Sequence, residues 1–376
     1  MPGADVMLVR GRLVLDDSIV PGRLAVEDGC ISAIEPDDAE AGGPLVLPGF
    51  VDVHCHGWGG HDAMGSREDL DGMARALLRR GVTSFLPTSV TASIDTLRAF
   101  ADRVRDWMPA APPDGAEPLG FNMEGPFISP QRKGAQNPAF IVAPADVPRD
   151  ALVPLLPGMR VMTVAPEAEG GLDLISWLAA NGVAPSLGHS EATFEEARAG
   201  YAAGGRTTTH LFNAMTGIVH HAPGLAVAAL TDDAVYVELI ADGHHVDVSL
   251  WPIITRTKPE DRLILVSDAM SIAGTGDGRA TLGGLEVQVV GSRATLLGTD
   301  TLAGSVIALD SAVRNLARSG MPLPAAAAAA SRNPLSLLGV DDRGRIAVGQ
   351  RADLVELDDD FVVQRVARAG EWFGAG

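Results

Sequence analysis

Short apolar segments alternate with helix-like segments through the middle of the chain. Segments with helical spacing of apolar residues, several with Ser or Asp near the start, cover residues 67–81, 93–108, 192–205 and 246–258. Eight short apolar runs recur around and between them, at residues 45–53, 84–90, 119–123, 160–165, 184–187, 207–209, 236–241 and 263–267. Eight strand–helix units of this kind predict an α/β fold, a (β/α)₈ barrel of the TIM type.

The two ends of the chain have a different pattern. Small apolar clusters alternate there with Gly, Asp and Pro, as in "GRLAVEDGCISAIEP" near the start, which predicts short strands. We expect residues 1–48 and 342–376 to form one small β-sandwich domain beside a barrel spanning residues 49–341. A Gly-rich segment at 281–298 predicts a hairpin, and the alanine run at 325–330 predicts a packing helix.

Chemistry-capable side chains fall at the carboxyl ends of the predicted strands, which meet at one mouth in a barrel. His54 and His56 end the first run, and on a strand two residues so spaced share one face. A lone histidine in such a place is more often a surface residue than a ligand, so the prediction depends on the whole set. Four imidazoles and two carboxylates predict a divalent transition-metal site of the Zn or Fe type. The candidates are His54, His56, Glu124, His189, His210 and Asp268.

The remaining histidines and the lysines narrow this hypothesis. His245 follows the seventh run and can reach the mouth as a substrate contact, whereas the pair at 220–221 is expected in a solvated loop. Neither Lys133 nor Lys258 ends a predicted strand, so a carboxylated lysine is not available to bridge two metals. Glu124 is then the natural bridging carboxylate.

Composition excludes several classes of partner. The 48 acidic and 29 basic residues give a net charge of −19, which disfavours binding to nucleic acid or to an anionic membrane. Only two cysteines, Cys30 and Cys55, are present, so a disulfide framework is not indicated. We see neither a signal peptide nor a membrane-length apolar run, and we expect a cytoplasmic protein acting on a small molecule.

The ordered motifs "PGFVDVHCHG", "MEGPF", "KGAQNP", "GHSEAT", "THLFNAM", "ADGHHVD" and "SDAM" resemble those of the amidohydrolase superfamily. Within it the chain is similar to the N-acetylglucosamine-6-phosphate deacetylases. The resemblance implies one metal on Glu124, His189 and His210, a second on the His54–His56 pair, and Asp268 as catalytic acid/base. It also implies a homodimer and an amino-sugar phosphate substrate. The implied substrate-binding residues are Ala135, Asn213, Ala214, His245, Leu302, Ala303 and Gly304.

One position departs from this family's pattern. Where its members usually place an arginine that reaches the substrate phosphate of a neighbouring subunit, this chain has His221. A histidine is only partly charged near neutral pH and lacks the two-pronged donor of a guanidinium. A related sugar such as N-acetylgalactosamine 6-phosphate, or the cyclic amide or deaminase substrates of other amidohydrolases, therefore stays open. A non-catalytic scaffold is disfavoured because all six ligand and acid/base candidates are present.

Overall fold

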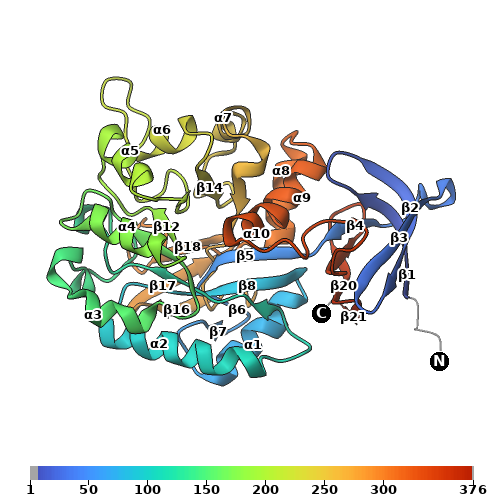
Figure 1. Cartoon of the computed structure of the whole chain (residues 1–376), viewed down its shortest axis with the longest axis horizontal. Coiled ribbons are helices and arrows are strands. Elements are labelled where there is room, and N and C mark those ends of the chain that lie inside the picture. The colour runs from blue at the N-terminus through green and yellow to red at the C-terminus, as the bar shows by residue number, and fades with distance from the viewer. Residues whose placement is uncertain (1–6, 375–376) are drawn as a thin grey trace.

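The computed structural model describes residues 7–374. Its larger part is a barrel of eight parallel strands surrounded by helices, so the predicted fold is confirmed (Figure 1). The peptide N–H of Asp268 donates to the carbonyl of His54 at 2.8 Å, which joins the last strand's end to the first strand. In sheet order the strands are β5 (Phe50–Cys55), β8 (Val82–Ser89), β10 (Phe121–Glu124), β11 (Met159–Val164), β12 (Ala184–Leu187), β13 (Thr207–Thr208), β14 (Tyr236–Leu239) and β15 (Leu263–Leu265).

Helices follow the barrel strands, and three of those described, α1, α2 and α5, begin at a Ser or Thr whose side chain caps the helix. Ser66 starts α1 and Thr193 starts α5 with a reciprocal capping box, in which side chain and backbone of the cap residue each bond to the third helical residue. None of the helices within residues 7–374 has the length and apolarity needed to cross a bilayer. The main helices are α1 (Arg67–Leu78), α2 (Ile94–Trp107), α4 (Gly171–Ala180), α5 (Phe194–Ala202), α6 (Leu225–Thr231), α7 (Trp251–Thr257), α8 (Leu309–Arg318), α9 (Leu323–Ala329) and α10 (Arg332–Leu338).

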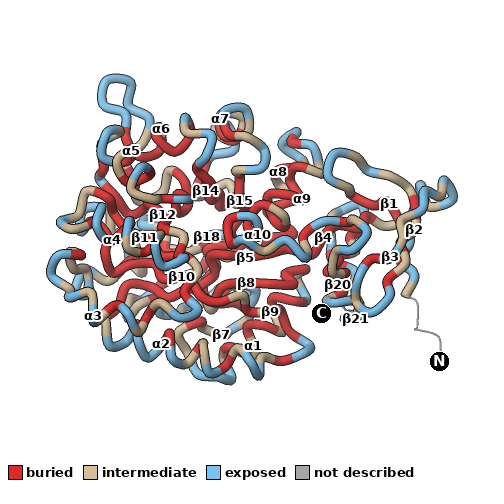
Figure 2. The backbone as a smooth tube through the Cα atoms, in the orientation of Figure 1, coloured by how far each residue is buried: buried red, intermediate tan, exposed pale blue. Residues whose placement is uncertain are grey.

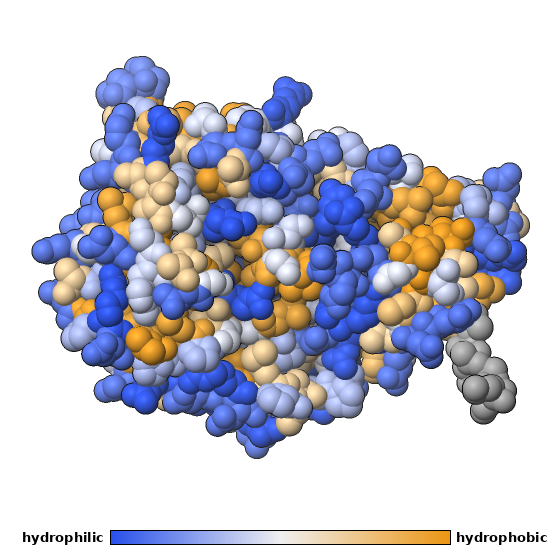
Figure 3. Space-filling model, viewed as in Figure 1, coloured by the Kyte–Doolittle hydropathy of each residue, from blue (hydrophilic) through white to orange (hydrophobic). Residues whose placement is uncertain are grey.

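Both ends of the chain build one separate sheet. Strands from the N-terminal segment and strands from the C-terminal segment share one apolar core, which includes Val9, Leu24 and Leu354. The sheet therefore curves over its own apolar face. Burial is greatest in this core and in the barrel strands (Figure 2). The face of the molecule drawn in Figure 3 is mostly hydrophilic, with a hydrophobic patch over the small sheet. In order the seven strands are β21 (Glu371–Gly374), β20 (Val363–Arg368), β19 (Leu354–Leu357), β4 (Leu45–Pro48), β1 (Met7–Val14), β2 (Ile19–Glu27) and β3 (Cys30–Pro36).

The first apolar run was wrongly interpreted as a single strand. It contains β4 of the small sheet and β5 of the barrel, separated at Gly49. A Cβ atom on Gly49 would lie 2.3 Å from Thr83 Oγ1, so only glycine fits where the chain passes between the two sheets. The run looked continuous because both strands are buried on both faces.

An antiparallel insert follows the eighth barrel strand and borders the barrel mouth. It consists of β16 (Gly278–Leu282), β17 (Leu285–Val290) and β18 (Arg293–Leu296), so the predicted hairpin is part of a three-stranded sheet. Its apolar side packs on Val90 and Met270, which follow barrel strands. The insert is thereby fixed as one wall above the strand ends.

Candidate active site

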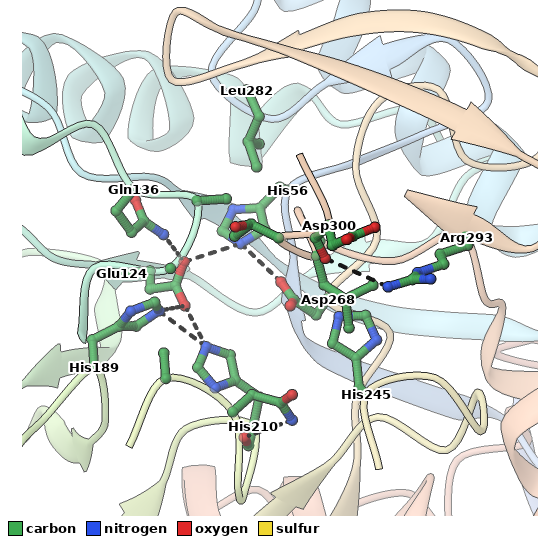
Figure 4. Close-up of a pocket in the computed structure, with 17 residues that line it drawn as sticks. His56, Glu124, Gln136, His189, His210, His245, Asp268, Leu282, Arg293 and Asp300 are labelled. Atoms are coloured by element: carbon green, nitrogen blue, oxygen red, sulfur yellow. Dashed lines mark hydrogen bonds and ion pairs between the residues drawn. The ribbon is translucent and has the colours of Figure 1, made fainter. Parts of the chain in front are cut away.

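The six predicted strand-end side chains converge at the barrel mouth (Figure 4). Three of them, His189, His210 and Asp268, have positive φ angles of 47°, 28° and 48°. Such a backbone is unfavourable for residues with a Cβ atom and is concentrated at functional sites. The turn it makes directly after a barrel strand brings these side chains over the mouth.

Glu124, His189 and His210 form the first group. Glu124 Oε1 lies 3.0 Å from His189 Nε2 and 2.9 Å from His210 Nε2, and the two Nε2 atoms are 3.1 Å apart. Ligand atoms bound to one tetrahedral ion at 2.0–2.1 Å are about 3.3 Å apart. The three donor atoms therefore have nearly the spacing required to share one transition-metal ion.

His54, His56 and Asp268 form the second group. His56 Nε2 lies 3.3 Å from His54 Nε2 and 3.1 Å from Asp268 Oδ1. Glu124 connects the groups, because its second oxygen, Oε2, is 3.3 Å from His56 Nε2. The donors in both groups are the imidazoles and carboxylates that Zn and Fe accept, so the residues fit one ion or a carboxylate-bridged pair.

Hydrogen bonds at the far side of the rings fix their orientation. His189 Nδ1 donates to the carbonyl of Arg132 at 2.8 Å, and His56 Nδ1 donates to the carbonyl of Thr88 at 3.1 Å. Glu238, a buried carboxylate of β14, lies 3.0 Å from His54 Nδ1. Each contact leaves Nε2 directed at the centre of the cluster, as metal-ligating histidines require.

The electrostatics of the cluster favour positive charge. Burial lowers the pKa of His54, but the carboxylates of Glu124 and Glu238 outweigh it and raise that pKa to about 9. The same balance holds for His56. Burial lowers its pKa, but Asp268 and Glu124 outweigh burial and raise that pKa to about 10. Burial would raise the pKa of Glu124, yet the adjacent imidazoles hold it well below its ordinary value. The negative charge of the carboxylates, which keeps protons on the histidines here, also attracts a metal ion, and the ion displaces those histidine protons when it binds.

A cavity of about 360 Å³ opens above the cluster. Six of the seven substrate-binding candidates implied by the resemblance line it: Ala135, Asn213, Ala214, His245, Leu302 and Gly304. His245 Nδ1 is held by Asp242 Oδ2 at 2.7 Å, which fixes its ring. Ala303 is buried in the core of the insert, and its peptide N–H donates to the carbonyl of Ala294. His221 is exposed on a loop and does not line the cavity.

Sequence reasoning missed several residues of this site. Gln136 Nε2 donates to Glu124 Oε2, and its Oε1 accepts the peptide N–H of Thr91 at 2.7 Å. Arg293 and Asp300 line the cavity from the insert and the loop that follows it. None of these residues ends a barrel strand, so the rule that located the ligands could not find them. Gln136 lies within the quoted motif "KGAQNP", and that motif was its one available signal.

The fold and the donor cluster together indicate a metal-dependent hydrolase, and comparison with known proteins agrees. Residues 45–373 match the model of the amidohydrolase family. The chain therefore belongs to the amidohydrolase family, and the predicted resemblance is confirmed.

Within that family, the chain is similar over nearly its full length to deacetylases of phosphorylated amino sugars. It is 39% identical to the N-acetylgalactosamine-6-phosphate deacetylase of Escherichia coli O157:H7, covering 93% of this chain and 94% of that one. It superposes on N-acetylglucosamine-6-phosphate deacetylase from Thermotoga maritima with a TM-score of 0.91 and 35% identity, covering 98% and 100% of the two chains. A mutant of the Mycobacterium smegmatis deacetylase in complex with N-acetyl-D-glucosamine-6-phosphate gives a TM-score of 0.90 at 35% identity, covering 98% and 99%.

Proposed function

We propose that this protein removes the acetyl group from N-acetyl-D-glucosamine 6-phosphate, giving D-glucosamine 6-phosphate and acetate. The observation that carries the proposal is the position of Glu124 between two histidine pairs, beside Asp268, at the base of a cavity of about 360 Å³. Amide hydrolysis needs an activated water and a proton for the departing amine, and this arrangement can provide both. The similarity to phosphorylated amino-sugar deacetylases supports the choice of substrate.

Glu124, His189 and His210 would hold one divalent metal, Zn or Fe, and His54 and His56 would hold a second. A bound metal of this kind lowers the pKa of water to about 7 and polarises a carbonyl oxygen. Gln136 supports the site by donating to the bridging carboxylate.

Asp268 is the proposed acid/base. It lines the cavity, and its carboxylate lies next to His56, within 3.1 Å of Nε2. There it takes a proton from the attacking water and returns it to the amine nitrogen as acetate departs. His245, oriented by Asp242, contacts the acetyl carbonyl or the sugar.

Other residues of the cavity wall are assigned to the sugar ring and the phosphate of the substrate. Ala135 and the segment 302–304 border the sugar ring, mainly through their backbones. Asn213 and Ala214, which follow His210, present their backbone to the phosphate. These assignments follow the motifs of the family and agree with the position of the residues around the cavity.

A second candidate substrate is N-acetyl-D-galactosamine 6-phosphate, which differs in the configuration at C4. The 39% identity to an enzyme of that name favours keeping it. The deciding experiment measures amine release from both phosphorylated sugars and from unphosphorylated N-acetylglucosamine, using the metal-loaded protein. We expect the highest kcat/KM for N-acetylglucosamine 6-phosphate. A higher value for the galactose isomer would reassign the substrate, and no release from either phosphorylated sugar would contradict the proposal.

We also propose that the protein is a homodimer that works in the cytoplasm. His221 lies on an exposed loop with the apolar residues Ile218 and Val219, and so can reach a substrate only in a second copy. Cys30 and Cys55 are free thiols, and a charged sugar phosphate does not cross a membrane unaided. Light scattering gives the oligomeric state. A dimer in which His221→Ala leaves the KM for the phosphorylated sugar unchanged would remove the residue from the site.

A further inference from the structure

Arg293 gives the cavity its strongest candidate for binding an anion. It begins β18, and among the described residues it is the one Lys or Arg side chain that lines the cavity. Its polar contact is a donation to the carbonyl of Asp300 at 3.4 Å, at the limit of a hydrogen bond. A guanidinium has five N–H donors, so most of its donors remain available to a ligand.

The turn that carries Arg293 is anchored on both sides. His244 Nε2 and Ser292 Oγ lie 2.8 Å apart, which ties the turn to the loop that bears His245. The peptide N–H of Gly291 donates to Asp277 at 2.8 Å, and Ala294 is buried in the core of the insert. Arg293 therefore extends from a fixed backbone position on a turn that contacts His244, the residue before His245.

The position of Arg293 fits the orientation of the proposed substrate in the cavity. In Figure 4 it lies beyond Asp268 and His245, on the side away from Glu124 and His189. The 2-acetamido group and the C6 phosphate of a hexosamine leave opposite sides of the pyranose ring. With the acetamide at the donor cluster, as the proposed function requires, the phosphate extends to the Arg293 side.

The acidic side chains around the cavity mean that a bound phosphate needs a positively charged partner. Glu124, Asp268 and Asp300 line the same cavity, and the chain as a whole is strongly acidic. His245 is paired with Asp242, so it does not supply an uncompensated positive charge. A phosphate dianion entering this space needs a permanent cation, and arginine supplies one with paired donors that fit phosphate oxygens.

We propose that Arg293 binds the 6-phosphate of the substrate and sets the preference for a phosphorylated sugar. This inference rests on the proposed function, and it assigns the charge that His221 does not provide within this chain. It also gives the inserted sheet a role in substrate recognition in addition to closing the cavity wall.

The test compares Arg293→Gln and Arg293→Lys with the matched control Arg279→Gln. Arg279 lies on strand β16 of the same three-stranded sheet, is exposed and does not line the cavity. For Arg293→Gln we expect a KM for N-acetylglucosamine 6-phosphate that is about 10- to 100-fold higher, the usual loss for a charge-assisted hydrogen bond. Values for unphosphorylated N-acetylglucosamine should stay unchanged. Arg293→Lys should give an intermediate KM because it keeps the charge and loses the paired donors.

Calorimetric binding of glucosamine 6-phosphate and of glucosamine separates this inference from the proposed function. The inference is supported if Arg293→Gln binds glucosamine 6-phosphate more weakly than wild type does but binds glucosamine equally well. This holds even if the wild type shows no turnover, in which case only the proposed function fails. The assignment of Arg293 is overturned if Arg293→Gln leaves the binding and the KM of the phosphorylated compounds unchanged. It is also overturned if the phosphorylated and unphosphorylated sugars lose affinity equally.

Discussion

Glu238 and His54 form a hydrogen bond in the interior of the barrel, with Glu238 Oε2 3.0 Å from His54 Nδ1. The same oxygen accepts the peptide N–H of His210 at 3.1 Å. One buried carboxylate thus orients a candidate ligand in each half of the donor cluster.

Replacing this carboxylate is expected to weaken metal binding without unfolding the protein. Glu238→Gln keeps the shape of the side chain but removes the charge that makes His54 a more basic ligand. Loss of such a partner typically reduces metal affinity about 10- to 100-fold. Metal content after dialysis against graded chelator concentrations measures the change, with Glu356→Gln in the small sheet as the control. Identical chelator titrations for wild type and Glu238→Gln would show that this carboxylate does not tune the site.

The arrangement around Glu124 predicts how metal content divides between the two groups. We expect metal-restored wild type to bind two ions per chain, and His56→Gln to bind one. Glu124→Gln should lose most of both, because its two oxygens face different histidine pairs. Elemental analysis of the three proteins gives the ratios. Less than one ion per chain in the restored wild type would contradict the assignment of the ligands.

A separate prediction concerns stability at alkaline pH. Lys258 is buried, with Nζ donating to the carbonyls of Ala229 and Asp232, and burial lowers its pKa to about 8. The unfolded chain retains the lysine proton up to the ordinary pKa, so the unfolded state binds more protons between pH 8 and that value. The free energy of unfolding contributed by this residue therefore rises with pH across that window.

Thermal unfolding of wild type and Lys258→Met at pH 7.5 and pH 9.5 measures this effect. We expect the wild type to gain Tm relative to the variant at the higher pH, because the cost of burying the ammonium group disappears as it loses its proton. A Tm difference that stays constant between the two pH values would show that Lys258 keeps an ordinary pKa.

The barrel and the six ligand and acid/base candidates could be predicted from the sequence because both follow a local rule. Barrel strands are short apolar runs, and the six candidate side chains lie just after five of the eight runs, so His189 and His210 could be found without knowing any contact. The same rule failed at residues 45–53, where two buried strands of different sheets follow each other. Helical spacing of apolar residues did not reveal α4 and α6, because their sequences are too uniformly apolar to show a helical period.

The residues that support the site could not be found in this way. Glu238 lies inside an apolar strand, and only the closed barrel shows that it faces His54. Arg293 lies on an insert whose packing on Val90 and Met270 depends on contacts between distant segments. Local patterns contain no information about such pairings.

The last prediction concerns Asp268, whose backbone is held independently of its carboxylate. Its peptide N–H donates to His54, and its carbonyl accepts the N–H of Ser305 at 2.7 Å. Asparagine tolerates the positive φ found here, so Asp268→Asn removes the acid/base group with little change in backbone geometry.

We expect Asp268→Asn to lower kcat by at least about 100-fold, the smaller end of what a positioned acid/base contributes. The metal held by Glu124, His189 and His210 should remain, because none of these ligands is altered. Single-turnover kinetics and elemental analysis on the same preparation measure both quantities. Asp300→Asn is the matched control, since it removes another carboxylate from the cavity wall. Activity above about a tenth of wild type in Asp268→Asn, with metal retained, would mean that another group moves the proton.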